Sequence, residues 1–389
     1  MIRRLGLLTL AIFLLLSLLS PSPASAQGGL KILDSWAEAK FPSILSFGLS
    51  VSSDVNITDV RLHYSVDRVS FAQVTSEVYI EFAPDTEVLA EWTWDMRKVG
   101  GLPPGTTISY WWTAKDESLN IVQTPPLELH FDDTRYSWRS LTEGKLTLYW
   151  YEGDEYFVQE LMATAQDALS RLERDTGAHL RRPSRMYIYA TAQELRGAMI
   201  YPQEWTGGVA FTSYGVIAIG IEPDNLSWGK KAMTHELTHL VVSQMTLNPY
   251  NDLPVWLDEG LAMYSEGVLG VQFATYLAMA VNEDSLFSVR SLASPFSAEA
   301  EKAVLSYAQS YSLVSFLVSS YGQEKILKLL NTFEQGSTYD GALEKVYGFD
   351  MDGLDSLWQE YLREQFQSAS KEKVSFEPTG ALATLVLID

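Results

Sequence analysis

The chain has 389 residues, a formal net charge of −21 and no cysteine. The excess of acidic residues makes nucleic acids and anionic membrane surfaces poor partners, and the absence of cysteine excludes a disulfide framework. Because 47% of the residues are apolar and 12% are aromatic, the chain is not disordered and is long enough to fill the cores of two domains.

Residues 1–26 predict a cleavable signal peptide. Arg3-Arg4 precedes an apolar run from Leu5 to Leu19, and the small-x-small site Ala24–Ala26 follows. The alternative is an uncleaved membrane anchor, for which 15 apolar-rich residues are short. We therefore expect a secreted or cell-surface protein with no stable membrane span after cleavage of the signal.

Residues 30–132 predict an all-β domain. Apolar and polar residues alternate in short runs near residues 60–66, 78–82, 90–94 and 108–114, with turn residues such as Pro103-Pro104-Gly105 between them. Short strands at this spacing are typical of a β-sandwich. The stretch GTTISYWWTAKD is similar to a late strand of fibronectin type III and other immunoglobulin-like modules, so we expect a sandwich of that class.

A second domain is predicted over residues 145–370, after a polar linker near 131–135. Strands at 145–151 and 185–190 flank a long amphipathic helix that stops at Gly177. Two further β runs, 207–213 and 216–221, are joined at Tyr214-Gly215. This hairpin is either an ordinary part of the sheet or an edge to which an extended peptide could pair.

The segment His235-Glu236-Leu237-Thr238-His239 carries the strongest chemical signal, because two of the five histidines in the chain fall within it. Residues four apart lie on the same face of a helix, so both imidazoles can reach one ion. A catalytic zinc site takes three protein ligands, and a neighbouring carboxylate can accept a proton from water. We therefore expect His235 and His239 to bind Zn²⁺, one ion per chain, with Glu236 as the general base. The alternative is an amphipathic helix whose histidines only fill the surface or the core.

The third ligand is expected in the segment Pro254–Tyr264, a second helix opened by proline. Nineteen residues separate His239 from Glu259, enough for a loop and a helix that returns to the metal. With HExxH, the segment WLDEGLAMY resembles the gluzincin metallopeptidases, the clan of thermolysin-like and aminopeptidase-like zinc enzymes. The resemblance implies an α+β metallopeptidase domain with Glu259 as third ligand. Asp258 stays the alternative, because the usual spacing of the aminopeptidase branch would select it.

Helical patterns predict a C-terminal helical lobe, with segments near residues 270–281, 298–321, 324–333, 341–346 and 354–366. Within it, the segment from Tyr307 to Tyr311 resembles the Y-x-x-S-Y helix that follows the ligand glutamate in small gluzincins. The resemblance implies that Tyr307 or Tyr311 stabilises the oxyanion during catalysis. The alternative is that both rings pack as an ordinary buried stripe.

Residues 371–389 are predicted to form a C-terminal tail. They end in nine mostly apolar residues, Ala381–Asp389, which are too few to cross a bilayer. These residues form a last strand or a sticky tail, or belong to a longer anchor.

The sequence thus predicts an exported zinc metallopeptidase that hydrolyses peptide or protein substrates, and it indicates no particular oligomeric state. No segment matches the GAMEN-like motif with which aminopeptidases hold a substrate's N-terminal amine, which favours an endopeptidase. The alternative is a cell-surface binding or adhesion protein, in which the β-sandwich binds its partner and the metallopeptidase-like domain is catalytically silent.

Overall fold

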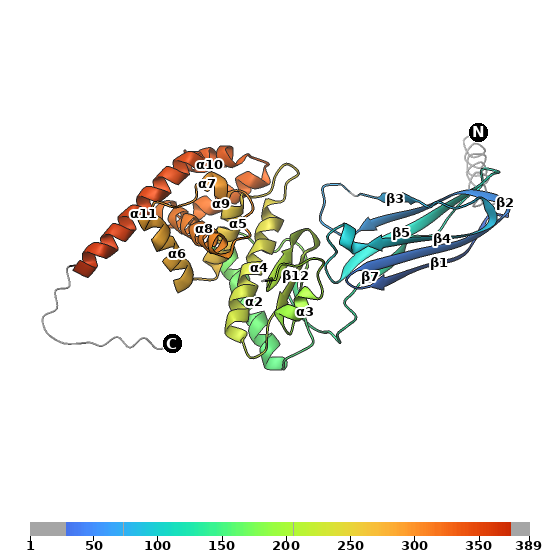
Figure 1. Cartoon of the computed structure of the whole chain (residues 1–389), viewed down its shortest axis with the longest axis horizontal. Coiled ribbons are helices and arrows are strands. Elements are labelled where there is room, and N and C mark those ends of the chain that lie inside the picture. The colour runs from blue at the N-terminus through green and yellow to red at the C-terminus, as the bar shows by residue number, and fades with distance from the viewer. Residues whose placement is uncertain (1–28, 73, 205, 375–389) are drawn as a thin grey trace, which may run out of the picture. The chain divides into compact units, whose positions relative to one another are not determined.

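The computed structural model describes residues 29–72, 74–204 and 206–374 (Figure 1). They form two compact units: the first runs to Asp67 and resumes from residue 74 to Asp132, and the second comprises Arg68–Ala72 and the chain from Asp133 onward. The predicted signal peptide, residues 1–26, and the tail beyond Val374 lie outside the described residues. Within the described ranges, no helix combines the length and the hydrophobicity needed to cross a membrane.

The first unit is rich in strands, as predicted, and its described strands join into one hydrogen-bonded sheet of seven. The 23-residue β2 is central to both halves: Ile44–Ser52 pairs with β1 and β4, whereas Ile57–Val66 pairs with β5 and β3. Alternate side chains are buried, among them Phe47, Leu62 and Trp112, as the period-2 pattern predicted. The strands are β1 (Lys31–Lys40), β2 (Ile44–Val66), β3 (Ser76–Tyr79), β4 (Asp85–Asp95), β5 (Thr106–Asp116), β6 (Ile121–Gln123) and β7 (Leu127–Phe131).

The second unit begins with a sheet whose described strands lie in the order β11-β12-β10-β9-β8. The inner strands β9, β10 and β12 are parallel, and the two edge strands are antiparallel to their neighbours. Helices α2 and α4 pack against each other beside this sheet (Figure 1). The elements are β8 (Arg139–Glu143), β9 (Leu146–Trp150), α2 (Glu155–Thr176), β10 (Ser184–Tyr189), α3 (Ala192–Arg196), β11 (Gly208–Phe211), β12 (Val216–Gly220) and α4 (Leu226–Thr246).

Local sequence explains the long helix α2. Asp154 caps its N-terminus by accepting a hydrogen bond from the Phe157 N–H, and Gly177 ends it in the left-handed conformation with φ of 69°. The predicted helix stop at Gly177 is therefore confirmed. Buried side chains of α2, β9, β10, β12 and α4 form one continuous apolar core with the helices that follow.

The C-terminal lobe is helical, as predicted. Helices α5 and α8 pack closely because residue 260 is glycine: a Cβ atom there would lie 2.4 Å from the carbonyl oxygen of Ser310. The described helices are α5 (Val255–Ser265), α6 (Val271–Asn282), α7 (Val289–Leu292), α8 (Ala300–Tyr321), α9 (Gln323–Glu334), α10 (Tyr339–Tyr347) and α11 (Met351–Val374).

The second unit extends past both ends of the predicted 145–370 domain. β8 precedes residue 145 and pairs with β9, so the sheet of the second unit begins before the predicted start of the domain. α11 continues to Val374, four residues into the predicted tail. Lysine and glutamate favour helices as strongly as leucine does, so the polar stretch before residue 374 does not end the helix.

Candidate metal centre

Helix α4 presents the two histidines of the HExxH segment on one face. Their ring centroids lie 4.8 Å apart with an interplanar angle of 76°. Leu237, Leu240 and Val241 are fully buried in the core of the unit. His235 and His239 are only half-buried beside these core residues, and the Nε2 atoms of both rings face Glu259 of α5.

Helix α5 brings Glu259 to the same point. Glu259 Oε2 lies 3.4 Å from His235 Nε2 and 3.5 Å from His239 Nε2. Among the described residues, these three form a group whose ligand atoms all lie within 4.8 Å of one another. Glu259 Oε2 is buried and has no hydrogen-bond partner in the described chain. A buried carboxylate oxygen facing two imidazole nitrogens fits a divalent cation, and a His₂Glu donor set is one that zinc accepts.

The electrostatics of the metal-free cluster follow from this geometry. Burial favours the neutral form of Glu259, but contacts with His235 and His239 outweigh it and lower the pKa of that carboxyl to about 2. Burial lowers the pKa of His235, yet contacts with Glu259 and Glu266 raise it to about 9. The pKa of His239 is likewise held well above its ordinary range by Asp258 and Glu259, against the effect of burial. The negative charge gathered here therefore favours a cation between the three side chains.

A second carboxylate stands behind each histidine. His235 Nδ1 lies 2.7 Å from Glu266 Oε1, and His239 Nδ1 lies 3.0 Å from Asp258 Oδ2, the latter at ion-pair distance but without the alignment of a hydrogen bond. Carboxylates at Nδ1 hold the rings so that both Nε2 atoms face the cluster. The alternative ligand Asp258 is thus placed behind His239 instead of beside Glu259. Sequence reasoning missed Glu266, although its position two helical turns after Glu259 could have indicated it.

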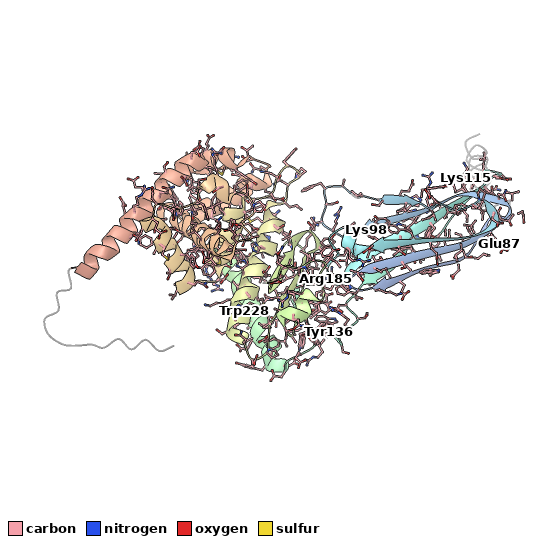
Figure 2. The ribbon with its side chains drawn as sticks, viewed as in Figure 1. Glu87, Lys98, Lys115, Tyr136, Arg185 and Trp228 are labelled. Carbon is pink, nitrogen blue, oxygen red and sulfur yellow. The ribbon has the colours of Figure 1, made fainter. Side chains whose placement is uncertain are left out.

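Glu236 lies against the edge strand of the sheet. Burial raises the pKa of its carboxyl above the ordinary range. A Cβ atom on Gly208 of β11 would lie 2.7 Å from Glu236 Oε1, so any larger residue there would force the Glu236 side chain out of its present position. The preceding residue, Gly207, instead faces the ring of Trp228, which lies near the N-terminal end of α4 (Figure 2). β11 is an edge strand of the sheet. This position is a requirement of the alternative in which an extended peptide pairs with the hairpin.

Tyr307 and Tyr311 lie one turn apart on α8 but have different surroundings. The pKa of Tyr307 is raised, first by burial and then by the charges of the site carboxylates, above all Glu259. Tyr311 instead neighbours Tyr264, with ring centroids 6.1 Å apart, and lines an apolar cavity of about 330 Å³ between α2, α5, α8 and α9. Of the two tyrosines, Tyr307 is the one in the electrostatic field of the metal cluster.

We compared the chain with curated proteins, with solved structures and with models of protein families. A search of curated proteins finds none that matches the chain. Among solved structures, the chain is 12% identical to an M1 zinc metallopeptidase from Deinococcus radiodurans, covering 86% of this chain and 95% of that one with a TM-score of 0.37. It is 12% identical to Legionella pneumophila aminopeptidase A in complex with aspartic acid, covering 85% of this chain and 50% of that one with a TM-score of 0.40.

OgpA from Akkermansia muciniphila is 9% identical, with 29% of this chain and 31% of that chain covered and a TM-score of 0.21. All three TM-scores lie below 0.5, so the family assignment depends on the sequence match alone. The profile of the Peptidase MA superfamily matches residues 164–364, more than half of the chain. The matched span includes α4 and α5 with the three clustered side chains. Because this match covers more than half of the chain, the chain belongs to the Peptidase MA superfamily.

Proposed function

We propose that the second unit is a zinc-dependent peptidase. The observation that carries the proposal is the convergence of His235 Nε2, His239 Nε2 and Glu259 Oε2 on one point, with a buried and unpartnered carboxylate oxygen among them. A zinc ion held there would supply Lewis acidity, which lowers the pKa of water and polarises a peptide carbonyl.

Glu236 is the proposed general base. It follows the first histidine on α4, and its raised pKa brings it closer to that of an efficient base near neutral pH. In the proposed reaction its carboxylate takes a proton from the attacking water and then delivers it to the leaving amine. Both transfers occur at the same carboxyl group, so the enzyme returns to its initial protonation state after each cycle.

Tyr307 is the proposed oxyanion donor. Its burial and the nearby carboxylates keep the phenol protonated at neutral pH, so its O–H can donate a hydrogen bond as negative charge develops on the carbonyl oxygen. Tyr311 is proposed to pack between α5 and α8, because it lines a cavity with Tyr264.

The edge strand β11 is the proposed docking site for the substrate backbone. Strand addition satisfies the free N–H and C=O groups of an edge, and it selects extended chains with little dependence on sequence. Gly208 places this edge directly beside Glu236. The β11 sequence Gly-Val-Ala-Phe offers no carboxylate to hold a substrate's terminal amine, which supports an endopeptidase.

For the first unit, we propose an immunoglobulin or fibronectin-like β-sandwich on an exported protein. The two halves of β2 pair with different strand groups, which suits two layers joined by one long strand. The alternative of an adhesion protein with a silent peptidase domain is not favoured, because the three proposed metal ligands His235, His239 and Glu259 are present and their ligand atoms lie together.

The proposal is tested by incubating purified protein with a broad peptide library and identifying cleavage sites by mass spectrometry. Hydrolysis should depend on about one zinc per chain and should stop on addition of a chelator. Internal cleavages should outnumber the removal of single N-terminal residues. Hydrolysis that persists after complete removal of metal would contradict the proposal.

A further inference from the structure

A polar pocket of about 350 Å³ lies at the end of β11 in the second unit. Its walls come from the turn after β11, where Thr212 and Ser213 lie, from the last turn of α4, and from the loop between α4 and α5. Asp258 completes the wall, and the same side chain stands behind His239. The pocket therefore adjoins the metal cluster without including its ligands or Glu236.

The charge of the pocket is entirely negative. Asp252 and Asp258 are the charged residues in its wall; hydroxyl and amide side chains form most of the rest. Asn251 also lines the pocket, and its Oδ1 atom is buried without a hydrogen-bond partner in the described chain. Carboxylate and amide oxygens accept hydrogen bonds, so the complementary group is a cation with several N–H donors.

The loop that carries Asp252 is held in one conformation. Asn248 Oδ1 accepts hydrogen bonds from the backbone N–H groups of Tyr250 and Asn251, and Asn248 Nδ2 donates to the carbonyl oxygen of Phe333. Asn251 Nδ2 donates to the carbonyl oxygen of Ser337. Because both asparagines bind the loop to the lobe, little conformational entropy remains to be lost when a ligand enters the pocket.

The position of the pocket along β11 relates it to the substrate. Gly208 at the start of the strand faces Glu236, and Thr212 and Ser213 directly follow its last residue. Extended chains advance about 3.4 Å per residue, so a substrate paired with β11 reaches the pocket roughly three to five residues from the reacting bond. A lysine or arginine side chain, with its long apolar stem, can then reach the acidic wall.

We propose that this pocket is a subsite for a lysine or arginine side chain of the peptide substrate. The inference rests on the proposed peptidase function and adds the class of residue that the enzyme prefers near the scissile bond. Asp252 is the specificity-determining residue, because it is exposed at the pocket and is not in contact with the metal ligands.

The hydrolysis experiment compares wild type with Asp252→Asn on the mass-spectrometric peptide library. Wild type should cleave most often where lysine or arginine occupies one fixed position within about five residues of the cut. Asp252→Asn should reduce the preference for lysine over glutamine at that position about fivefold, as expected for one partly exposed charge. Asp252→Glu, which keeps the charge, and Asp167→Asn on α2 should leave the preference unchanged. An unchanged preference in Asp252→Asn, or cleavage without any cationic preference, would overturn the inference while leaving the peptidase proposal intact.

The binding experiment needs no catalysis. Zinc-loaded Glu236→Gln protein is titrated with fluorescein-labelled alanine-glycine decapeptides that carry one lysine at each position in turn, and with the matching glutamine peptides. At least one lysine peptide should bind about fivefold more tightly than its glutamine counterpart. Introducing Asp252→Asn into the Glu236→Gln protein, or raising the salt concentration, should remove this difference in affinity. If binding shows this pattern but wild type hydrolyses nothing, the peptidase proposal fails and the cationic site stands. Equal binding of lysine and glutamine peptides would refute the site.

Discussion

Replacing Gly208 with alanine should impair catalysis without unfolding the protein. The added Cβ atom would lie 2.7 Å from Glu236 Oε1 and about as close, 3.0 Å and 3.1 Å, to its Cγ and Cδ atoms. Comfortable contacts are about 3.5 Å, so the carboxyl group must move by roughly 0.5–1 Å. Because a misplacement of about 1 Å can lower a rate by about 100-fold, Gly208→Ala should reduce kcat about 10- to 100-fold. Zinc content should stay near one ion per chain, since no ligand is displaced.

Gly207→Ala is the matched control, because it adds the same methyl group one residue earlier. Its Cβ atom would meet the ring of Trp228 at 3.2 Å instead of the catalytic carboxylate. The assay measures kcat on a peptide identified in the library, together with zinc by mass spectrometry and the melting temperature of each variant. Gly208→Ala enzyme with wild-type kcat would show that Glu236 is not constrained by β11 and would refute the reasoning.

Three further outcomes are expected. Glu266→Ala removes the carboxylate that orients His235, so zinc affinity should fall about 10- to 100-fold in a competition with a chelator; unchanged affinity would deny Glu266 this role. Tyr307→Phe should lower kcat about 10- to 100-fold with little change in KM, whereas Tyr311→Phe should stay within about threefold of wild type, and the reverse order would exchange their roles. In metal-free protein, burial raises the pKa of Glu236 above 4.5, so its ionisation opposes folding as pH rises past that value. Glu236→Gln should then raise the melting temperature by a few degrees at pH 7 but not at pH 4, and an equal effect at both values would exclude this linkage.

Much of the candidate site was predictable because it depends on local rules. The 3.6-residue period places His235 and His239 on one face of α4, and the loop length lets α5 return with Glu259. The choice between Asp258 and Glu259 was not predictable from spacing alone. It depends on which face of α5 meets α4, and the packing of Gly260 against Ser310 of α8 fixes that face.

Other features depend on contacts between distant residues and were not predictable. β8 pairs with β9 although its exposed, polar sequence lacks a clear strand pattern. The contact of Gly208 with Glu236 joins a strand and a helix that the sequence pattern treats separately. The acidic pocket likewise forms only when three parts of the chain come together: the turn after β11, Asp258, and the loop that Asn248 holds by hydrogen bonds. Strand pairing and loop packing of this kind are decided by tertiary structure, not by periodicity.

The most direct test of a zinc peptidase centred on α4 and α5 is the parallel measurement of zinc content and peptide hydrolysis in Glu236→Gln. Glutamine keeps the size of the side chain and removes the base, and Glu236 is not among the three clustered ligands. The variant should therefore retain about one zinc per chain and lose at least about 100-fold in chelator-sensitive hydrolysis. Hydrolysis equal to that of wild type, or loss of the zinc itself, would contradict the roles assigned to these residues.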